Sequence, residues 1–91
     1  MGEHEGNNAI VTGGIKGIGR AVSLALLGEG ARVTAIYAND DAAADRFREE
    51  ANFGDMLETV KLDVSGYEAC EAFYKTYEEK YKSLDILVNS A

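Results

Sequence analysis

The stretch IVTGGIKGIGRAV, from Ile10 to Val22, places four glycines between two apolar segments. A glycine-rich turn that leaves a strand and opens a helix presents backbone N–H groups at the positive end of that helix. Such a turn can hold a phosphate group without a cationic side chain. The glycines at 13, 17 and 19 follow the spacing G-x-x-x-G-x-G, which differs from the general dinucleotide fingerprint and from a Walker loop.

These three glycines have separate expected roles. Gly13 stands where the strand ends and a side chain would obstruct the turn, whereas Gly17 allows the backbone to approach a pyrophosphate closely. Gly19 allows the helix to pack tightly on the sheet. A purely structural turn is the alternative, because a glycine-rich turn alone is a weak signal of nucleotide binding.

Apolar periodicity elsewhere alternates between strand-like and helix-like segments. Four short apolar segments are predicted as strands: Ala9–Thr12, Arg32–Tyr37, Leu57–Leu62 and Leu84–Asn89. The segments between them have helical spacing of apolar residues. We expect Gly28 and Gly30 to end the first helix and Gly54 to end the second. Ser65 or Gly66 is expected to cap the third.

This order of elements predicts an α/β fold, β-α-β-α-β-α-β, with a parallel sheet covered by helices on both faces. A flavodoxin-like strand order is the alternative. Since no repeat or linker is visible, we interpret residues 1–91 as a single domain with a polar N-terminal tail at residues 1–8. Cys70 and the tyrosines at 74, 77 and 81 fall on one helical stripe and are expected to pack in the core.

Composition and charge restrict the partners and the compartment. A net charge of −7 argues against nucleic-acid or anionic-membrane binding, because such surfaces need clustered Lys and Arg. The single cysteine, Cys70, forms no internal disulfide and suits a reducing compartment. No apolar run approaches the roughly 20 residues that span a bilayer, and the N-terminal residues lack the apolar core of a secretory signal. The sequence therefore predicts a cytoplasmic protein with no metal site, no membrane segment and no nucleic-acid partner.

Three motifs in a fixed order then identify a family. TGGIKGIG (Thr12–Gly19), LDVS (Leu62–Ser65) and LDILVNSA (Leu84–Ala91) each stand at the carboxyl end of a predicted strand. Together they resemble the short-chain dehydrogenase/reductase family, with its TGxxxGxG loop, its Asp-Val pair and its Asn-Asn-Ala-Gly motif. The resemblance covers essentially the whole chain, and within the family the sequence looks most like 3-oxoacyl-[acyl-carrier-protein] reductases. It implies the N-terminal portion of a Rossmann fold, with strand order 3-2-1-4, from an NAD(P)-dependent oxidoreductase that acts on a carbonyl substrate, such as the 3-oxoacyl thioesters of fatty-acid synthesis.

The resemblance also implies cofactor contacts. The glycine loop would contact the pyrophosphate and the adjacent ribose through Gly13, Lys16, Gly17, Ile18 and Gly19.

The other implied contacts follow the third and fourth strands. Asp63 would accept a hydrogen bond from the adenine amino group and Val64 would supply a backbone N–H to the ring, although Asp63 could instead cap a helix. Asn89 and Ala91 would border the adenosine ribose and support the central strand. Ser90 departs from the family, which usually has a second Asn there, and this leaves its support of the neighbouring strand open.

The end of the second strand bears on the choice between NADP and NAD. The position of the acid that binds the ribose 2′-hydroxyl in NAD-dependent enzymes falls on Tyr37, which is uncharged. Lys16 could reach a 2′-phosphate, whereas Asp40 and Asp41 follow shortly and no Arg stands before them. We therefore expect NADP, with NAD as the alternative.

Catalytic residues are not expected in this chain. The resemblance implies a Ser and a Tyr-x-x-x-Lys pair beyond the fourth strand, and no tyrosine here is followed by lysine at that spacing. The chain is thus interpreted as the dinucleotide-binding portion of a reductase, inactive alone. The alternatives are a stand-alone nucleotide-binding half-domain and a non-catalytic fragment that self-associates. Self-association is expected because the fourth strand would form an open edge of the sheet, and family relatives are also expected to form homo-oligomers.

Overall fold

The computed structural model describes residues 6–81 and 83–90 and has the predicted α/β architecture. Its parallel four-stranded sheet has the order β3-β2-β1-β4, which confirms the predicted strand order. The elements, in chain order, are β1 (Asn8–Thr12), α1 (Gly17–Gly28), β2 (Arg32–Tyr37), α2 (Asp41–Ala51), a 3₁₀ turn η1 (Gly54–Met56), β3 (Leu57–Lys61), α3 (Tyr67–Tyr81) and β4 (Ile86–Asn89).

The strand ends differ slightly from the prediction. Asn8, which was placed in the polar tail, is the first residue of β1, and residues 1–5 of that tail lie outside the described part of the chain. Leu62 follows β3, and Leu84 precedes β4 by two residues. In each case the central apolar residues of the segment lie in the strand, as predicted.

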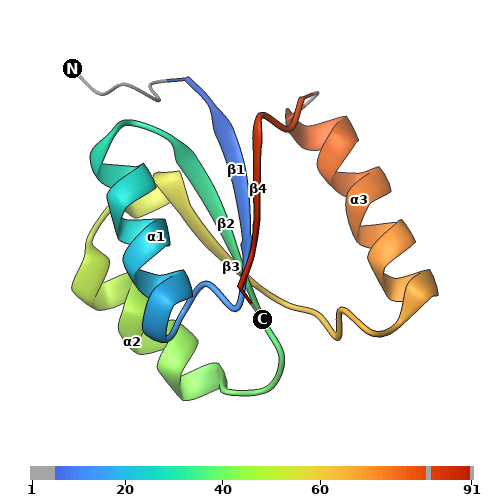
Figure 1. Cartoon of the computed structure of the whole chain (residues 1–91), viewed down its shortest axis with the longest axis horizontal. Helices are drawn as coiled ribbons and strands as arrows, with labels where there is room; N and C mark the ends of the chain where they lie inside the picture. The colour runs from blue at the N-terminus through green and yellow to red at the C-terminus, as the bar shows by residue number, and fades with distance from the viewer. Residues whose placement is uncertain (1–5, 82, 91) are drawn as a thin grey trace.

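Helices α1 and α2 cover one face of the sheet and α3 covers the other (Figure 1). Side chains alternate along each strand, so that Val11 and Val33 pack in the cluster under α1 and α2, while Ile10 and Ile36 pack against Tyr77 of α3. Tyr74 and Tyr81 pack against this second cluster, as predicted for the tyrosine stripe. Cys70 is only half-buried and belongs to neither cluster, so its predicted core position is wrong.

The helix ends show where glycine is needed. α1 ends at Gly28, and Gly30 follows with φ of 90°, in the left-handed region, as predicted. α2 ends differently: Asn52 takes the left-handed position with φ of 55°, and Gly54 opens the 3₁₀ turn instead of closing the helix. Asparagine tolerates this conformation better than most other non-glycine residues, which explains why Asn52 and not Gly54 ends the helix. Gly66 directly precedes α3, at the capping position predicted for Ser65 or Gly66.

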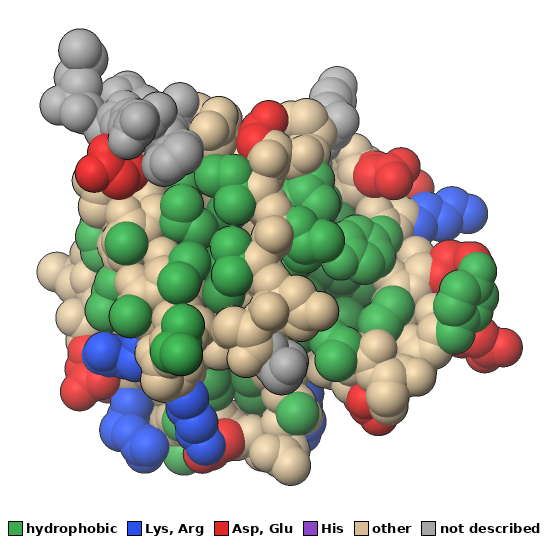
Figure 2. All heavy atoms as spheres, viewed as in Figure 1, with side chains coloured by type: hydrophobic (Ala, Val, Ile, Leu, Met, Phe, Trp, Pro, Cys, Tyr) green, Lys and Arg blue, Asp and Glu red, His purple; other side chains and the backbone are tan. Residues whose placement is uncertain are grey.

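Strand β4 forms one edge of the sheet, since its only strand partner in the described part of the chain is β1. Leu87 of this strand is 55% exposed, and Leu84 just before it is also exposed. In Figure 2, hydrophobic side chains lie at the surface on both sides of β4, over α1 and toward α3. None of the helices within residues 6–81 and 83–90 combines the length and apolar character needed to cross a membrane.

Candidate dinucleotide site

The candidate residues gather at the carboxyl end of the sheet. β1 pairs with β2 on one side and with β4 on the other, and the helices that follow β1 and β3 lie on opposite faces. The carboxyl end of β1 is therefore a topological switch point, where open α/β sheets bind ligands.

The glycine loop is anchored to β2 through its backbone. The N–H of Gly13 donates to the carbonyl oxygen of Ile36 at 2.8 Å, and the N–H of Gly14 donates to the same oxygen at 3.3 Å. Gly13 has φ of 66°, which a residue with a side chain rarely adopts. These two N–H groups are thus engaged within the protein, and an anion would be held by later N–H groups of the loop.

Those later N–H groups belong to the first turn of α1. Lys16 is the N-cap residue of α1, its side chain makes no capping hydrogen bond, and no acidic residue stands in the first turn. The first N–H groups of a helix have no partner inside the helix and attract anions. Gly17 has φ of 54°, with open space where a side chain would begin, and Ile18 is exposed beside it. This end of α1 can accept a phosphate group on its backbone.

Gly19 is required for a different reason. A Cβ atom at this position would lie 2.0 Å from the carbonyl oxygen of Gly13 and 2.6 Å from Oγ of Ser90. These distances agree with the packing role predicted for Gly19, and they show that the helix packs against its own loop and the end of β4.

Gly14 and Ser23 support the loop, and the sequence reasoning missed both. A Cβ atom on Gly14 would lie 2.8 Å from Cβ of Ala35, so β2 passes close behind the loop. The buried Ser23 hydroxyl donates to the Gly14 carbonyl oxygen at 3.1 Å. The signal available for this contact was a serine on the buried side of the helix, among apolar residues.

Thr12 joins the ends of β1 and β4. Its hydroxyl donates to Oδ1 of Asn89 at 2.9 Å and accepts from the N–H of Ser90 at 3.2 Å. The Ser90 hydroxyl in turn donates to the Thr12 carbonyl oxygen at 2.7 Å. Serine therefore does support the neighbouring strand at this position. Ala91 lies outside the described residues.

A hollow of about 180 Å³ lies between the glycine loop and the end of β2. Its lining residues are Gly13, Ile15, Lys16, Tyr37, Ala38, Asn39 and Asp40. Nζ of Lys16 lies 2.7 Å from Oδ2 of Asp40. The hydrogen bond from Lys16, together with one from the backbone N–H of Ala43, lowers the pKa of the Asp40 carboxyl below its ordinary value.

The neighbouring polar groups are paired with one another. The Tyr37 hydroxyl donates to Oδ1 of Asp41 at 2.8 Å, and this bond to a carboxylate raises the pKa of Tyr37. Nζ of Lys61 lies 3.4 Å from Oδ2 of the same carboxylate. Tyr37 thus faces the hollow with its hydroxyl held by α2.

A second hollow, of about 300 Å³, adjoins the first at the start of α1. Three cationic residues line it, namely Lys16, Arg20 and Arg46, together with Glu50, which lies 3.4 Å from the Arg20 guanidinium. Lys and Arg side chains are visible near the start of α1 in Figure 2. Although the whole chain is acidic, three cationic side chains gather at the start of α1, and two of them, Lys16 and Arg20, are paired with carboxylates.

Asp63 forms a local turn after β3. Its Oδ1 accepts from the N–H of Ser65 at 2.9 Å and from the Ser65 hydroxyl at 2.6 Å. These two bonds lower the pKa of the Asp63 carboxyl. Its carboxylate makes no capping bond to α3, and both Asp63 and Val64 are exposed at the carboxyl end of the sheet. The adenine contacts of these two residues stay a prediction.

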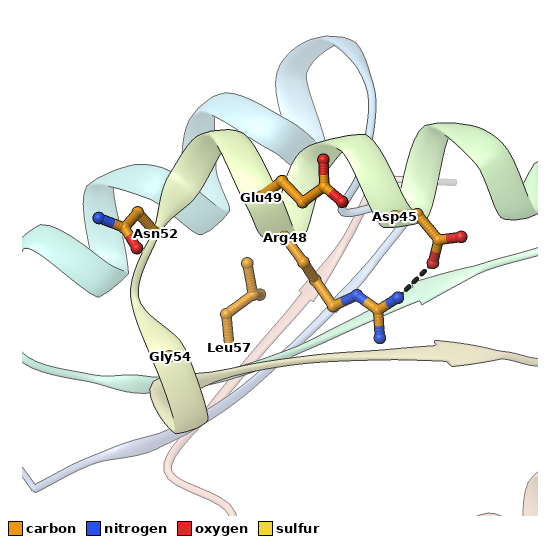
Figure 3. Close-up of a pocket in the computed structure, with 6 residues that line it drawn as sticks. All are labelled: Asp45, Arg48, Glu49, Asn52, Gly54 and Leu57. Atoms are coloured by element: carbon orange, nitrogen blue, oxygen red, sulfur yellow. Dashed lines mark hydrogen bonds and ion pairs between the residues drawn. The ribbon is translucent and has the colours of Figure 1, made fainter.

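A hollow at the amino end of β3 contains none of the candidate residues. It measures about 470 Å³ and is lined by Asp45, Arg48, Glu49, Asn52, Gly54 and Leu57 (Figure 3). Its cation, Arg48, is already paired with Asp45. Nor does any group of three His, Cys, Asp or Glu residues within the described ranges form a metal site.

Known proteins of one family are similar to this chain in sequence and in fold. A family described as short chain dehydrogenase matches residues 7–91. The acetoacetyl-CoA reductase of Paracoccus denitrificans is 45% identical over 83 residues, which are 91% of this chain and 33% of that protein. The 3-oxoacyl-[acyl-carrier-protein] reductase of Synechocystis is 38% identical over 85 residues, covering 91% of this chain and 34% of that protein.

The likeness extends to solved structures. A crystal structure of a short chain dehydrogenase from Bacillus anthracis superposes with a TM-score of 0.87 at 27% identity, over 97% of this chain and 35% of that one. The chain thus spans about a third of the length of the relatives that it matches.

Proposed function

The chain belongs to the short-chain dehydrogenase family, and from that premise we propose that it is the dinucleotide-binding portion of an NADP-dependent reductase. The observation that carries the proposal is the start of α1, where Lys16 makes no side-chain cap and the first N–H groups are left for a ligand. Two hollows lined by cationic side chains lie beside these groups. A pyrophosphate fits this donor set, because it needs backbone N–H groups and positive charge more than it needs any particular side chain.

Each candidate residue has a part in this proposal. The backbone from Lys16 to Gly19 holds the pyrophosphate, and Gly13 keeps the loop in place through its bond to Ile36. Asp63 and Val64 face the adenine, and Asn89 and Ala91 border its ribose.

The cofactor supplies a hydride to a carbonyl carbon, and this chain binds and orients that cofactor. No tyrosine in the sequence is followed by lysine four positions later. We therefore assign cofactor binding to these 91 residues and the protonation of the carbonyl to groups that they do not contain. A stand-alone nucleotide-binding half-domain is the second candidate function, and the same binding site favours it.

A 3-oxoacyl thioester is the proposed substrate. The Paracoccus and Synechocystis relatives are named for acetoacetyl-CoA and for a 3-oxoacyl-carrier-protein, which share a ketone two bonds from a thioester.

As part of the same proposal we place the protein in the cytoplasm, because a single cysteine suits a reducing compartment. We also treat residues 1–91 as part of one Rossmann domain.

NADP is proposed over NAD because Tyr37 is uncharged and Lys16 faces the same hollow. Titration of the chain with NADPH and with NADH, followed by calorimetry and by nicotinamide fluorescence, tests this preference. We expect NADPH to bind more tightly. Tighter binding of NADH would replace NADP with NAD, and binding of neither by a chain with native circular dichroism would overturn the proposed function.

Self-association through β4 is proposed for the chain as it stands. An open parallel edge with an exposed Leu87 can pair with another copy. Sedimentation velocity should show dimers or larger species that Leu87→Lys removes. Tyr67→Lys is the control, since Tyr67 of α3 is 78% exposed but away from the edge. A monomer at high concentration would refute the proposal.

A further inference from the structure

We propose that the hollow around Arg32, at the amino end of the sheet, binds a small oxyanion, either a phosphate or a carboxylate. The hollow measures about 450 Å³ and adjoins the one in Figure 3, with which it shares Arg48 and Leu57. Arg32 and Leu57 are the first residues of β2 and β3, so the hollow lies at the opposite end of the sheet from the glycine loop. Because none of the described residues that line it belongs to the candidate dinucleotide site, such a site goes beyond the proposed function.

Arg32 is a half-buried cation that has no carboxylate partner among the described residues. Arg46 and Lys75 make no ion pair in that part of the chain either, but both are exposed to water. The other described cations are all paired with acids: Lys16, Arg20, Arg48, Lys61 and Lys80. A charge that is partly removed from water is stabilised by hydrogen bonds or by an opposite charge. Arg32 is thus the cation whose charge the described chain leaves least compensated.

Two contacts hold the Arg32 guanidinium in place. Its Nη1 donates to the main-chain carbonyl oxygen of Asp55 at 2.8 Å, and its Cζ lies over the Tyr81 ring, 5.4 Å from the ring centre. The carbonyl is uncharged, so it orients the side chain without neutralising it. The edge of the guanidinium that carries Nε and Nη2 has no hydrogen-bond partner among the described residues. Two parallel N–H donors of this kind match two oxygens of a carboxylate or a phosphate.

The acids that line the hollow leave this edge of Arg32 free. Oε2 of Glu58 lies 2.7 Å from Nζ of Lys80 and also accepts from the Tyr81 hydroxyl at 3.4 Å. Asp55 is exposed, and its bond to Arg32 is made by its main chain. An incoming oxyanion would therefore meet a paired carboxylate at Glu58 and a solvated one at Asp55.

Two further cations, Lys80 and Arg48, line the same hollow. Each is paired with an acid, but their side chains are 55% and 48% exposed, and ion pairs at such exposure are weak. They can add attraction for an anion, whereas Arg32 supplies the oriented donors. The site therefore suits a small oxyanion that one guanidinium can hold.

NMR titration of the 91-residue chain locates the site. The probes are sodium phosphate, sodium malonate and sodium chloride at equal ionic strength, so that the two oxyanions are compared with each other and with a simple anion. We expect the Arg32 Nε–H resonance and the amides of Asp55 and Glu58 to shift with phosphate, with malonate or with both, and not with chloride. The oxyanion that shifts them at lower concentration identifies the ligand chemistry. Phosphate at the glycine loop is followed separately, on the amides of Gly17 and Gly19.

Three variants make the test specific. Arg32→Gln removes the charge and the paired donors, so we expect oxyanion binding to weaken about tenfold or more. Arg32→Lys keeps the charge but loses the fork, and we expect a weakening of about threefold or more. Arg46→Gln is the matched control, because Arg46 lies on α2 and lines the hollow at the start of α1. It should leave the shifts around Arg32 unchanged.

The outcomes distinguish this site from the dinucleotide site. Equal shifts with chloride, shifts confined to the glycine loop, or equal weakening by Arg32→Gln and Arg46→Gln would overturn the oxyanion site while cofactor binding stands. If Arg32→Gln loses its native circular dichroism, Arg32→Lys decides the matter, and unchanged binding in that variant would overturn the role of the guanidinium.

Discussion

Substitution of Gly19 by alanine should unfold the chain more easily and should abolish dinucleotide binding. The added Cβ atom would lie 2.0 Å from the Gly13 carbonyl oxygen, whereas real Cβ atoms essentially never approach a neighbour within 3.0 Å. Either the loop or α1 must therefore move by about 1 Å. Overpacking of this kind costs about 1–3 kcal/mol, and the upper end applies because the obstacle is backbone. Alanine returns about 1 kcal/mol through its helix propensity.

The expected net loss is about 2 kcal/mol, which corresponds to a fall in Tm of roughly 8–16 °C for a domain of this size. Gly28→Ala is the matched control, since Gly28 lies in the same helix and nothing lies within 4 Å of its added Cβ. This variant should gain about 0.5 kcal/mol. Urea unfolding followed by circular dichroism measures both. Equal stability of the two variants would refute the close approach of α1 to its loop.

Three other predictions follow from hydrogen bonds and buried groups. Tyr77→Phe should cost nothing at pH 7, because the buried Tyr77 hydroxyl has no partner among the described residues. Burial raises the pKa of Tyr77 to about 12, so between pH 10 and 12 only the unfolded chain ionises there, and stability falls as the pH rises. Urea midpoints at pH 8 and pH 11 should show a smaller fall for the variant than for the parent chain, and an equal fall would contradict the burial of that hydroxyl. Ser90→Ala should lower the free energy of unfolding by about 1 kcal/mol, since it removes the bond to the Thr12 carbonyl; an unchanged urea midpoint would show that this bond contributes nothing. Ser65→Ala should raise the pKa of the Asp63 carboxyl toward its ordinary value of 3.8, because Ser65 holds the ionised form. A carbon NMR titration measures the pKa of the Asp63 carboxyl directly. An unchanged pKa would show that the Ser65 hydroxyl does not stabilise the ionised carboxylate.

At low pH the stability of the chain should change with pH in the opposite direction from the change that Tyr77 causes at high pH. Hydrogen bonds lower the pKa values of Asp40 and Asp63 in the folded chain below 3.8. Their contribution to stability is therefore complete above that value and is lost as the pH falls through the folded pKa. Lys16→Met should reduce this loss at Asp40, since Lys16 is the first cause of that shift.

The sequence predicted most of the fold because burial and periodicity act over neighbouring residues. The runs around Val11, Val33 and Leu87 were placed as strands on their apolar patterns, and the motif order indicated how they assemble. The end of α2 was missed because Asn52 takes a left-handed position that its type permits but does not require. Cys70 was placed on a helical stripe by its spacing, but it lies in the first turns of α3 and joins neither core cluster.

The sequence named the residues of the candidate site but not the contacts among them. The ion pair between Lys16 and Asp40 joins residues 24 positions apart, and no periodicity connects them. The same holds for Ser90, whose hydroxyl replaces an asparagine and still reaches Thr12 because the strand ends bring the two together. Contacts of this kind depend on strand register, which local patterns indicate only once the pairing is known.

The glycine loop is anchored by a main-chain carbonyl, that of Ile36. The next residue, Tyr37, is the one on which we expect the cofactor preference to depend. Every amino acid at position 36 supplies the same oxygen. Substitutions around Tyr37 can therefore alter the ribose side of the site while the loop keeps its geometry. For the dinucleotide site that we propose, evolution and protein engineering can thus change the cofactor preference at the end of β2 without rebuilding the glycine loop.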